Sequence, residues 1–93
     1  MEKLEKLELM DKILRELDDL KNSQTSTLKK VSQIEAHNIN LGVGLLDNKL
    51  PDLHEGIDSS VIIISDLLDE FKEYRDKFYV DNKLEALQDP TAK

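Results

Sequence analysis

Two histidines and a series of closely spaced carboxylates are the residues of this chain whose types and spacing could support chemistry. His37 and His54 are the only histidines, and neither belongs to a metal-binding motif such as His-Glu-x-x-His. Glu35 is two residues from His37, and this spacing places the two side chains on different faces of a helix. The predicted helix pairing also separates the histidines, with His37 near Ser60 and His54 near Val43. We therefore expect neither catalysis nor metal binding from them.

Carboxylates recur at helical spacing in the second half of the chain. Side chains three or four residues apart share one face of a helix, and paired acidic motifs on facing helices hold magnesium in helical nucleotide hydrolases. The stretch predicted to face these acids contains Lys29 and Lys30 rather than a second acidic motif. The spacing therefore favours a solvent-exposed face over a magnesium site. The acids concerned are Asp66, Asp69, Glu70, Glu73 and Asp76.

One apolar residue, Ile62, lies within this acidic surface. On a helical wheel it falls on the side away from Ile57, Ile64 and Phe71, which belong to the predicted core. An isolated exposed isoleucine is common and needs no explanation, and a contact with a partner protein is the alternative. The candidate partner-binding residues are Asp58, Ile62, Asp66, Asp69, Glu73 and Asp76.

Composition excludes several other kinds of site. The chain has no cysteine, which excludes disulfides, thiolate nucleophiles and cysteine-ligated metals. Gly42-x-Gly44 lacks the preceding strand and the lysine of a phosphate-binding loop. With 20 acids against 13 Lys and Arg the net charge is −7, whereas a non-specific binder of phosphate backbones is expected to be basic. We expect no enzymatic activity, no cofactor and no direct contact with nucleic acid.

A heptad pattern between positions 10 and 46 predicts a long first helix over residues of about 2–46. Acid–base pairs four residues apart, such as Glu8 and Lys12, support it. The a row contains Met10, Leu17, Gln24, Val31, Asn38 and Leu45, the d row contains Ile13, Leu20, Thr27, Ile34 and Leu41, and Leu14 and Leu28 add contacts from the e row.

A polar run at residues 22–27 interrupts the apolar pattern of this helix. Its Asn, Ser and Thr residues are poor helix formers and good caps. Either the helix continues through the run, or one helix ends near Lys21 and another begins near Thr25. The heptad keeps its phase across the run and no glycine or proline breaks it, so we favour the continuous helix.

A turn is predicted at about residues 42–51 and a second helix at about 51–80. Pro51 suits the first turn of a helix, although Gly56 allows a later start near Asp58. Val61 to Ile64 have strand propensity, but helical patterning on both sides favours a helix. The a row contains Leu50, Ile57, Ile64, Phe71 and Phe78, and the d row contains Leu53, Ser60, Leu67 and Tyr74.

The predicted turn pairs the two helices as an antiparallel hairpin, a single domain over residues 1–80. Phe71 then lies near Thr27 and Phe78 near Leu20, so that the four aromatic residues between 71 and 79 close one end of the bundle opposite residues 24–27. Residues 81–93 are expected to form a short C-terminal turn and a frayed tail. In that segment Leu84 and Leu87 could complete a last helical turn.

The sequence therefore predicts an all-α fold, an antiparallel helical hairpin with coiled-coil-like seams. A lone hairpin of this length leaves much of its seam uncovered, so we expect a helical-bundle homo-oligomer, with a dimer favoured. The residues expected in its core and oligomer seam are Met10, Ile13, Leu17, Leu20, Val31, Ile34, Leu41, Ile57, Ile64, Leu67, Phe71, Tyr74 and Phe78.

Two functions are consistent with this architecture. The first is a non-enzymatic interaction protein that self-associates and presents its acidic face to a partner protein. The second is an acidic inhibitor or nucleic-acid mimic that occupies the basic groove of a nucleic-acid-binding protein. No apolar run approaches the roughly 18 residues of a membrane span, and the first residues lack the apolar core of a signal peptide. A cytoplasmic location is therefore expected.

Overall fold

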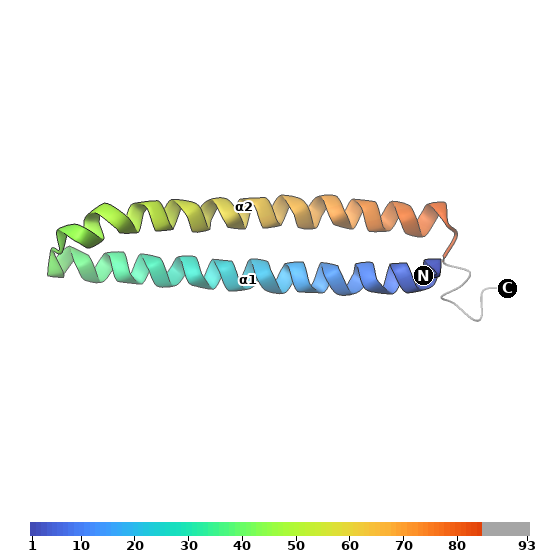
Figure 1. Ribbon diagram of the computed structural model, residues 1–93, viewed down its shortest axis with the longest axis horizontal. Helices are drawn as coiled ribbons and strands as arrows, with labels where there is room; N and C mark the ends of the chain where they lie inside the picture. Colours follow the sequence, from blue (N-terminus) through green and yellow to red (C-terminus); the bar gives the residue numbers. More distant parts are fainter. Residues whose placement is uncertain (85–93) are drawn as a thin grey trace. The chain divides into compact units, whose positions relative to one another are not determined.

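The computed structural model describes residues 1–84, which form two long helices packed as a hairpin (Figure 1). Helix α1 is Lys3–Leu41 and helix α2 is Gly44–Asp81. The described residues contain no strand, so the prediction of an all-α hairpin is confirmed. Within these residues, no helix is long and apolar enough to cross a membrane.

Helix α1 passes through the polar run at residues 22–27 without a break. The hydroxyl groups of Thr25 and Thr27 donate to the carbonyl oxygens of Lys21 and Ser23, at 2.9 and 3.0 Å. A threonine hydroxyl that donates to the carbonyl of the preceding turn has its hydrogen bond within the same helix, so it does not cap the start of another helix. The polar run is therefore a polar layer within α1, as the continuous heptad phase indicated.

Only Gly42 and Val43 separate the two helices. Gly42 adopts a φ of 69°, a left-handed conformation that favours glycine. The buried Asn38 side chain holds this loop: its Oδ1 accepts from Val43 N at 2.9 Å, and its Nδ2 donates to Val43 O and to Asp47 Oδ1 at 3.2 and 2.7 Å. The turn is therefore limited to Gly42 and Val43, and it is shorter than the turn predicted at residues 42–51 because the Asn38 side chain supplies its hydrogen bonds.

Pro51 lies inside α2 rather than at its start. The sequence prediction used proline's preference for a first helical turn, but α2 begins at Gly44, where the loop hydrogen bonds to Asn38 fix the chain. Proline has no N–H to donate to the preceding turn, and its ring crowds that turn. In Figure 1 the first turns of α2 slope away from the line of the rest of the helix.

The chain divides into two compact units. We call Asp19–Ser65 the turn unit, and residues 1–18 together with 66–84 the terminal unit. The core of the turn unit is formed by Val31, Leu50 and Ile57, with Leu28 and Leu46 packed against them.

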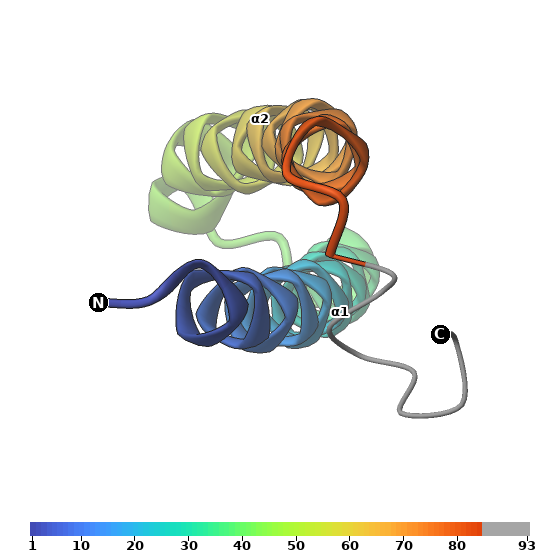
Figure 2. The same cartoon turned by 90° about the vertical axis from the view of Figure 1, so that its right-hand side faces the viewer.

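The terminal unit contains the two most deeply buried side chains, Leu7 and Leu84. After α2, Lys83 adopts a φ of 53°, and Leu84 N donates to Tyr79 O while Lys83 N donates to Val80 O. This is the Schellman arrangement, which commonly carries a hydrophobic contact at the position of Leu84. Figure 2 shows this segment crossing from the end of α2 toward the beginning of α1. The predicted contribution of Leu87 and the predicted tail lie outside the described residues.

Candidate interaction surface

The residues of the predicted a rows are buried or half-buried within α1 and α2, except Leu45, which is 66% exposed. On α1 they are buried or half-buried at Met10, Leu17, Gln24, Val31 and Asn38, and on α2 at Leu50, Ile57, Ile64, Phe71 and Phe78. The second row of each seam, however, is the e row. On α1 it contains Leu7, Leu14, Lys21, Leu28 and Glu35, and on α2 His54, Val61, Leu68, Arg75 and Asn82, all at least half-buried.

Apart from the half-buried Ser60, the residues of the d rows that were predicted to share this seam are exposed. This corrects the heptad frame within one chain for Ile13, Leu20, Ile34 and Leu41 on α1 and for Leu53, Leu67 and Tyr74 on α2. The apolar stripe of α1 is three rows wide, and a single partner helix covers two rows. The e rows of both helices lie in the seam, with apolar residues such as Leu28 and Leu68 and with polar contacts between α1 and α2.

One such contact lies in the turn unit, where His54 Nδ1 bonds Glu35 Oε1 at 2.7 Å. In the same unit Gln24 Nε2 donates to Ser60 Oγ at 2.9 Å. The predicted register had placed His54 near Val43 and Ser60 near His37, and it is wrong because the loop is shorter and earlier than predicted. No buried side-chain polar atom among the described residues lacks a hydrogen-bond partner.

The second contact lies in the terminal unit, where Arg75 binds Asp11 through two hydrogen bonds. Arg75 Nε donates to Asp11 Oδ1 at 2.7 Å and Arg75 Nη2 to Asp11 Oδ2 at 3.3 Å, and the guanidinium carbon lies 5.1 Å from the centre of the Tyr79 ring. The bond to Asp11 raises the pKa of Arg75, with burial opposing it and Asp76 adding to it. Sequence reasoning did not predict either contact. Polar residues at e positions, Glu35, His54 and Arg75, were the sequence signal for them, whereas Asp11 lies in the b row.

The aromatic residues predicted to lie opposite residues 24–27 belong to the terminal unit instead. Phe71 and Tyr74 stack with ring centres 6.2 Å apart, and the register does not bring Phe71 to Thr27 or Phe78 to Leu20, which are in the turn unit. A shallow, almost wholly apolar hollow of about 290 Å³ lies beside them, lined by Leu67, Glu70, Phe71 and Tyr74. The hollow lies on the exposed d-row side of α2.

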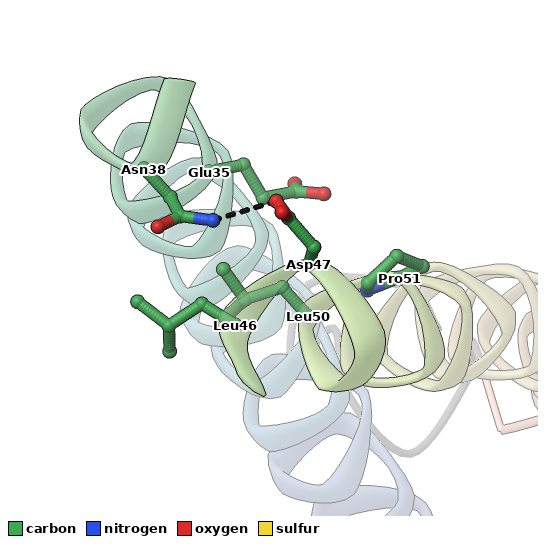
Figure 3. Close-up of a pocket in the computed structure, with 6 residues that line it drawn as sticks. All are labelled: Glu35, Asn38, Leu46, Asp47, Leu50 and Pro51. Carbon is green, nitrogen blue, oxygen red and sulfur yellow. Dashed lines mark hydrogen bonds between the residues drawn. The ribbon is translucent and has the colours of Figure 1, made fainter. Parts of the chain in front are cut away.

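A second small hollow lies beside the loop in the turn unit. Figure 3 shows the Asn38 amide pointing to Asp47, with Glu35 on the same side. The volume is about 90 Å³, and Leu46, Leu50 and Pro51 complete the lining. Among the described residues no three acidic or histidine side chains are grouped as metal ligands would be. The polar side chains that line this hollow include Asn38 and Asp47, which belong to the hydrogen-bonding network of the loop.

The candidate partner-binding residues are all exposed on α2, outside the seam. Ile62 is 56% exposed, as the helical wheel predicted. Asp76 lies 3.2 Å from Arg75 Nη1. The carboxylates among them are Asp58 in the turn unit and Asp66, Asp69, Glu73 and Asp76 in the terminal unit, all exposed.

Comparison with known protein families, curated proteins and solved structures finds no match to this chain.

Proposed function

We propose that this chain is a non-enzymatic interaction protein of the cytoplasm that self-associates, with a homodimer as the favoured state. The observation that carries the proposal is the pair of exposed apolar d rows, which repeat at heptad spacing on both helices. A heptad row of large apolar residues is the surface by which helices pack into bundles. A small hairpin with such rows uncovered buries little core and gains stability by burying them against another copy.

The geometry of antiparallel helices strengthens this proposal. In each helix the d row follows the a row on the same rotational side of the seam. Because the two helices run in opposite directions, their d rows lie on the same face of each unit. In the turn unit Leu20, Ile34 and Leu53 lie on this face, and all three are exposed. The face is wide enough to receive two further helices, as in a four-helix bundle.

The proposal is tested by the mass of the protein in solution. Light scattering coupled to gel filtration is expected to give a dimer, and Ile34→Lys is expected to give a folded monomer. Ile39→Lys is the matched control, because Ile39 is on the same helix and is 82% exposed but outside the d row, whereas Ile34 is 38% exposed within it. The control should retain the dimer mass. A monomer mass for the unmodified protein, or the same mass for both variants, contradicts the proposal.

We further propose that the acidic surface of α2 receives a protein partner. On the helical wheel Ile62, Asp58 and Asp66 lie outside the d rows. Self-association through the d rows would therefore leave these side chains exposed. Charged surfaces of one sign speed association with an oppositely charged partner. Replacing Ile62 by Ser should weaken that binding while leaving dimer mass and helicity unchanged. Lost dimer mass in Ile62→Ser contradicts the separation of the two surfaces.

A nucleic-acid mimic is the second candidate, and the exposure of all five carboxylates of this surface favours it. Carboxylates can substitute for phosphates against a basic protein groove. Pull-down from lysate at low and high salt separates the candidates. A mimic should capture a nucleic-acid-binding protein and release it as salt rises, whereas a salt-resistant partner of another kind supports the first proposal.

A further inference from the structure

Two hollows on α2 of the terminal unit have the residue spacing of coiled-coil holes. In a coiled coil, each side chain that points to the neighbouring helix enters a hole formed by four residues of that helix. Residues that surround one such point on a helix have the positions i, i+3, i+4 and i+7. The hollow of about 290 Å³ is lined at this spacing by Leu67, Glu70, Phe71 and Tyr74. A second hollow, of about 240 Å³, is lined at the same spacing by Tyr74, Lys77, Phe78 and Asp81, together with Asn82.

The two holes lie one heptad apart and differ in polarity. The first, which we call the apolar hole, is almost wholly apolar. The second, which we call the polar hole, has Lys77, Asp81 and Asn82 in its lining. Charged groups that are covered without a polar partner lower stability. The holes therefore fit a helix that carries an apolar side chain and, seven residues away, a charged or polar one.

The d row of α1 in the same unit carries this pair of residues. Ile13 is 37% exposed, and Lys6, seven residues before it, is also exposed. The contact of Asp11 with Arg75 sets their level along α2. Because the helices are antiparallel, Ile13 lies near the level of residue 73 and Lys6 near the level of residue 80. Each is therefore within the span of one hole, Ile13 with the apolar hole and Lys6 with the polar hole.

We infer that α1 of a second copy fills the two holes, with its terminal unit packed against the terminal unit of the first chain. The inference rests on the self-association proposed above and adds which helices meet. A twofold axis parallel to the helices keeps the two terminal units at one level and places α1 of each copy antiparallel to α2 of the other. Ile13 of the second copy then enters the apolar hole, and its Lys6 enters the polar hole beside Asp81.

The same packing covers an apolar residue of α1 outside the d row. Leu9 is 43% exposed and Tyr74 is 60% exposed. Tyr74 of the second copy lies within the span of a hole on α1, formed at the same spacing by Lys6, Leu9, Met10 and Ile13. Contact with the aromatic ring removes apolar surface of Leu9 from water. The holes and the side chains that enter them are thus reciprocal between the two copies.

The alternative within the terminal unit packs α2 on α2 of the second copy. Its d-row residues seven apart are Leu67 and Tyr74, so a leucine would enter the polar hole and cover Lys77 and Asp81. This alternative would bring Glu70 to Lys77 of the second copy, whereas the α1 pairing brings Glu70 to Glu16. Both glutamates are exposed, and exposed charge pairs contribute little to stability. The polarity of the two holes therefore favours α1.

Single cysteines test the pairing, because the chain has no cysteine of its own. Chains with Glu16→Cys and chains with Glu70→Cys are mixed, allowed to exchange and treated with a short bis-maleimide. A cross-linked dimer with one chain of each kind, identified by its mass, is expected. A mixture of Glu70→Cys with Lys77→Cys is the matched control and should give no mixed dimer, since α2 of one copy does not pack on α2 of the other.

The outcomes separate this inference from the proposed function. A monomer mass with no cross-link in either mixture overturns both. A dimer mass with cross-linking only between positions 70 and 77 shows that α2 meets α2. A dimer mass with no cross-link in either mixture shows that the contact lies outside the terminal unit. Each of the last two results overturns the inference and leaves the proposed self-association standing.

Charge reversal at Glu70 provides an independent test, with opposite signs for the two pairings. Glu70→Lys acts twice in a symmetric dimer and replaces two like-charged pairs by two opposite-charged pairs. It is expected to lower the dissociation constant by about tenfold. Glu73→Lys makes the same charge change at an exposed residue outside both holes and should lower it by less than about threefold. A dimer that is weakened by Glu70→Lys would mean that Glu70 faces Lys77 of the second copy, and the α1 pairing would be wrong.

Discussion

Arg75 of α2 binds Asp11 of α1 in the terminal unit. It stands in the e row of α2, where an apolar residue would be the ordinary choice, and its planar guanidinium binds both oxygens of Asp11. A lysine ammonium keeps the charge but not this fork geometry. The bond to Asp11 raises the pKa of Arg75 further above its ordinary value, and an arginine is already protonated at neutral pH without this shift.

The fork geometry makes a specific prediction for Arg75→Lys. We expect this variant to lower the free energy of unfolding by about 1 kcal/mol, because one of the two hydrogen bonds is lost while the charge remains. Urea denaturation measures it. Arg15→Lys is the control at an exposed arginine of α1 and should change stability by less than about 0.5 kcal/mol. Equal effects at the two positions would show that the two hydrogen bonds of the guanidinium add no stability beyond that given by its positive charge.

A comparison of two isoleucines of α2 distinguishes the buried seam from the exposed acidic surface. Ile64 is 9% exposed and Ile62 is 56% exposed. Ile64→Ser should therefore lower stability by about 3 kcal/mol, through the cavity and the buried hydroxyl, and Ile62→Ser by no more than about 0.5 kcal/mol. Denaturant melts of the two variants measure the difference. Equal and large losses would mean that α2 is buried on both sides, and the partner surface would have to be abandoned.

At the scale of the elements, the two helices continue through residues that commonly end helices. Thr25 and Thr27 bond back to α1, and Pro51 is carried within α2. The helix propensity of a single residue contributes little compared with the burial of an apolar stripe that continues over many turns. The position of Pro51 nevertheless leaves a helical hydrogen bond unmade, since proline cannot donate to Asp47 O.

Pro51→Ala tests whether this residue lies inside α2. Inside the helix the change restores a backbone donor and is expected to raise stability by about 1–3 kcal/mol. At a first helical turn, where the sequence placed it, proline is favourable and alanine would bring no gain. Thermal and urea unfolding measure the change. Asp52→Ala is the control at the next exposed position, and a gain of the same size there would assign the effect to general helix propensity.

At the scale of the whole molecule, the stability of the fold is expected to depend on self-association. The described residues bury few large apolar side chains completely and expose many others at heptad spacing. A hairpin of this kind stabilised by a second copy folds and associates together, so its stability depends on protein concentration. The same exposed rows would be a solubility hazard in a permanent monomer.

The melting temperature should therefore fall on dilution. A hundredfold dilution weakens a dimer by about 2.7 kcal/mol, which corresponds to a decrease of about 5–10 °C for two chains of this size. Helical circular dichroism followed across that range gives the measurement. A melting temperature that stays constant, together with a monomer mass, would rule out an exchanging dimer.

Sequence alone determined the class and connectivity of the fold. Heptad spacing predicted two long helices and an intervening turn, and it placed the a rows, such as Val31 and Ile57, in the seam. It also left Ile62 on the outside, because a 3.6-residue repeat fixes opposite faces within one helix whatever the helix packs against.

Only the tertiary structure decided which second row completes the seam and how the helices are in register. The d and e rows of α1 are both rich in apolar residues, so apolar content could not rank them. In the structure the e rows lie in the seam, where residues such as Glu35 and His54 form contacts that exist only when both helices are present. The register depended on Asn38, whose side chain closes a loop at Gly42 and Val43. These contacts join residues of the two helices or of the loop, and periodicity within a single helix carries no information about them.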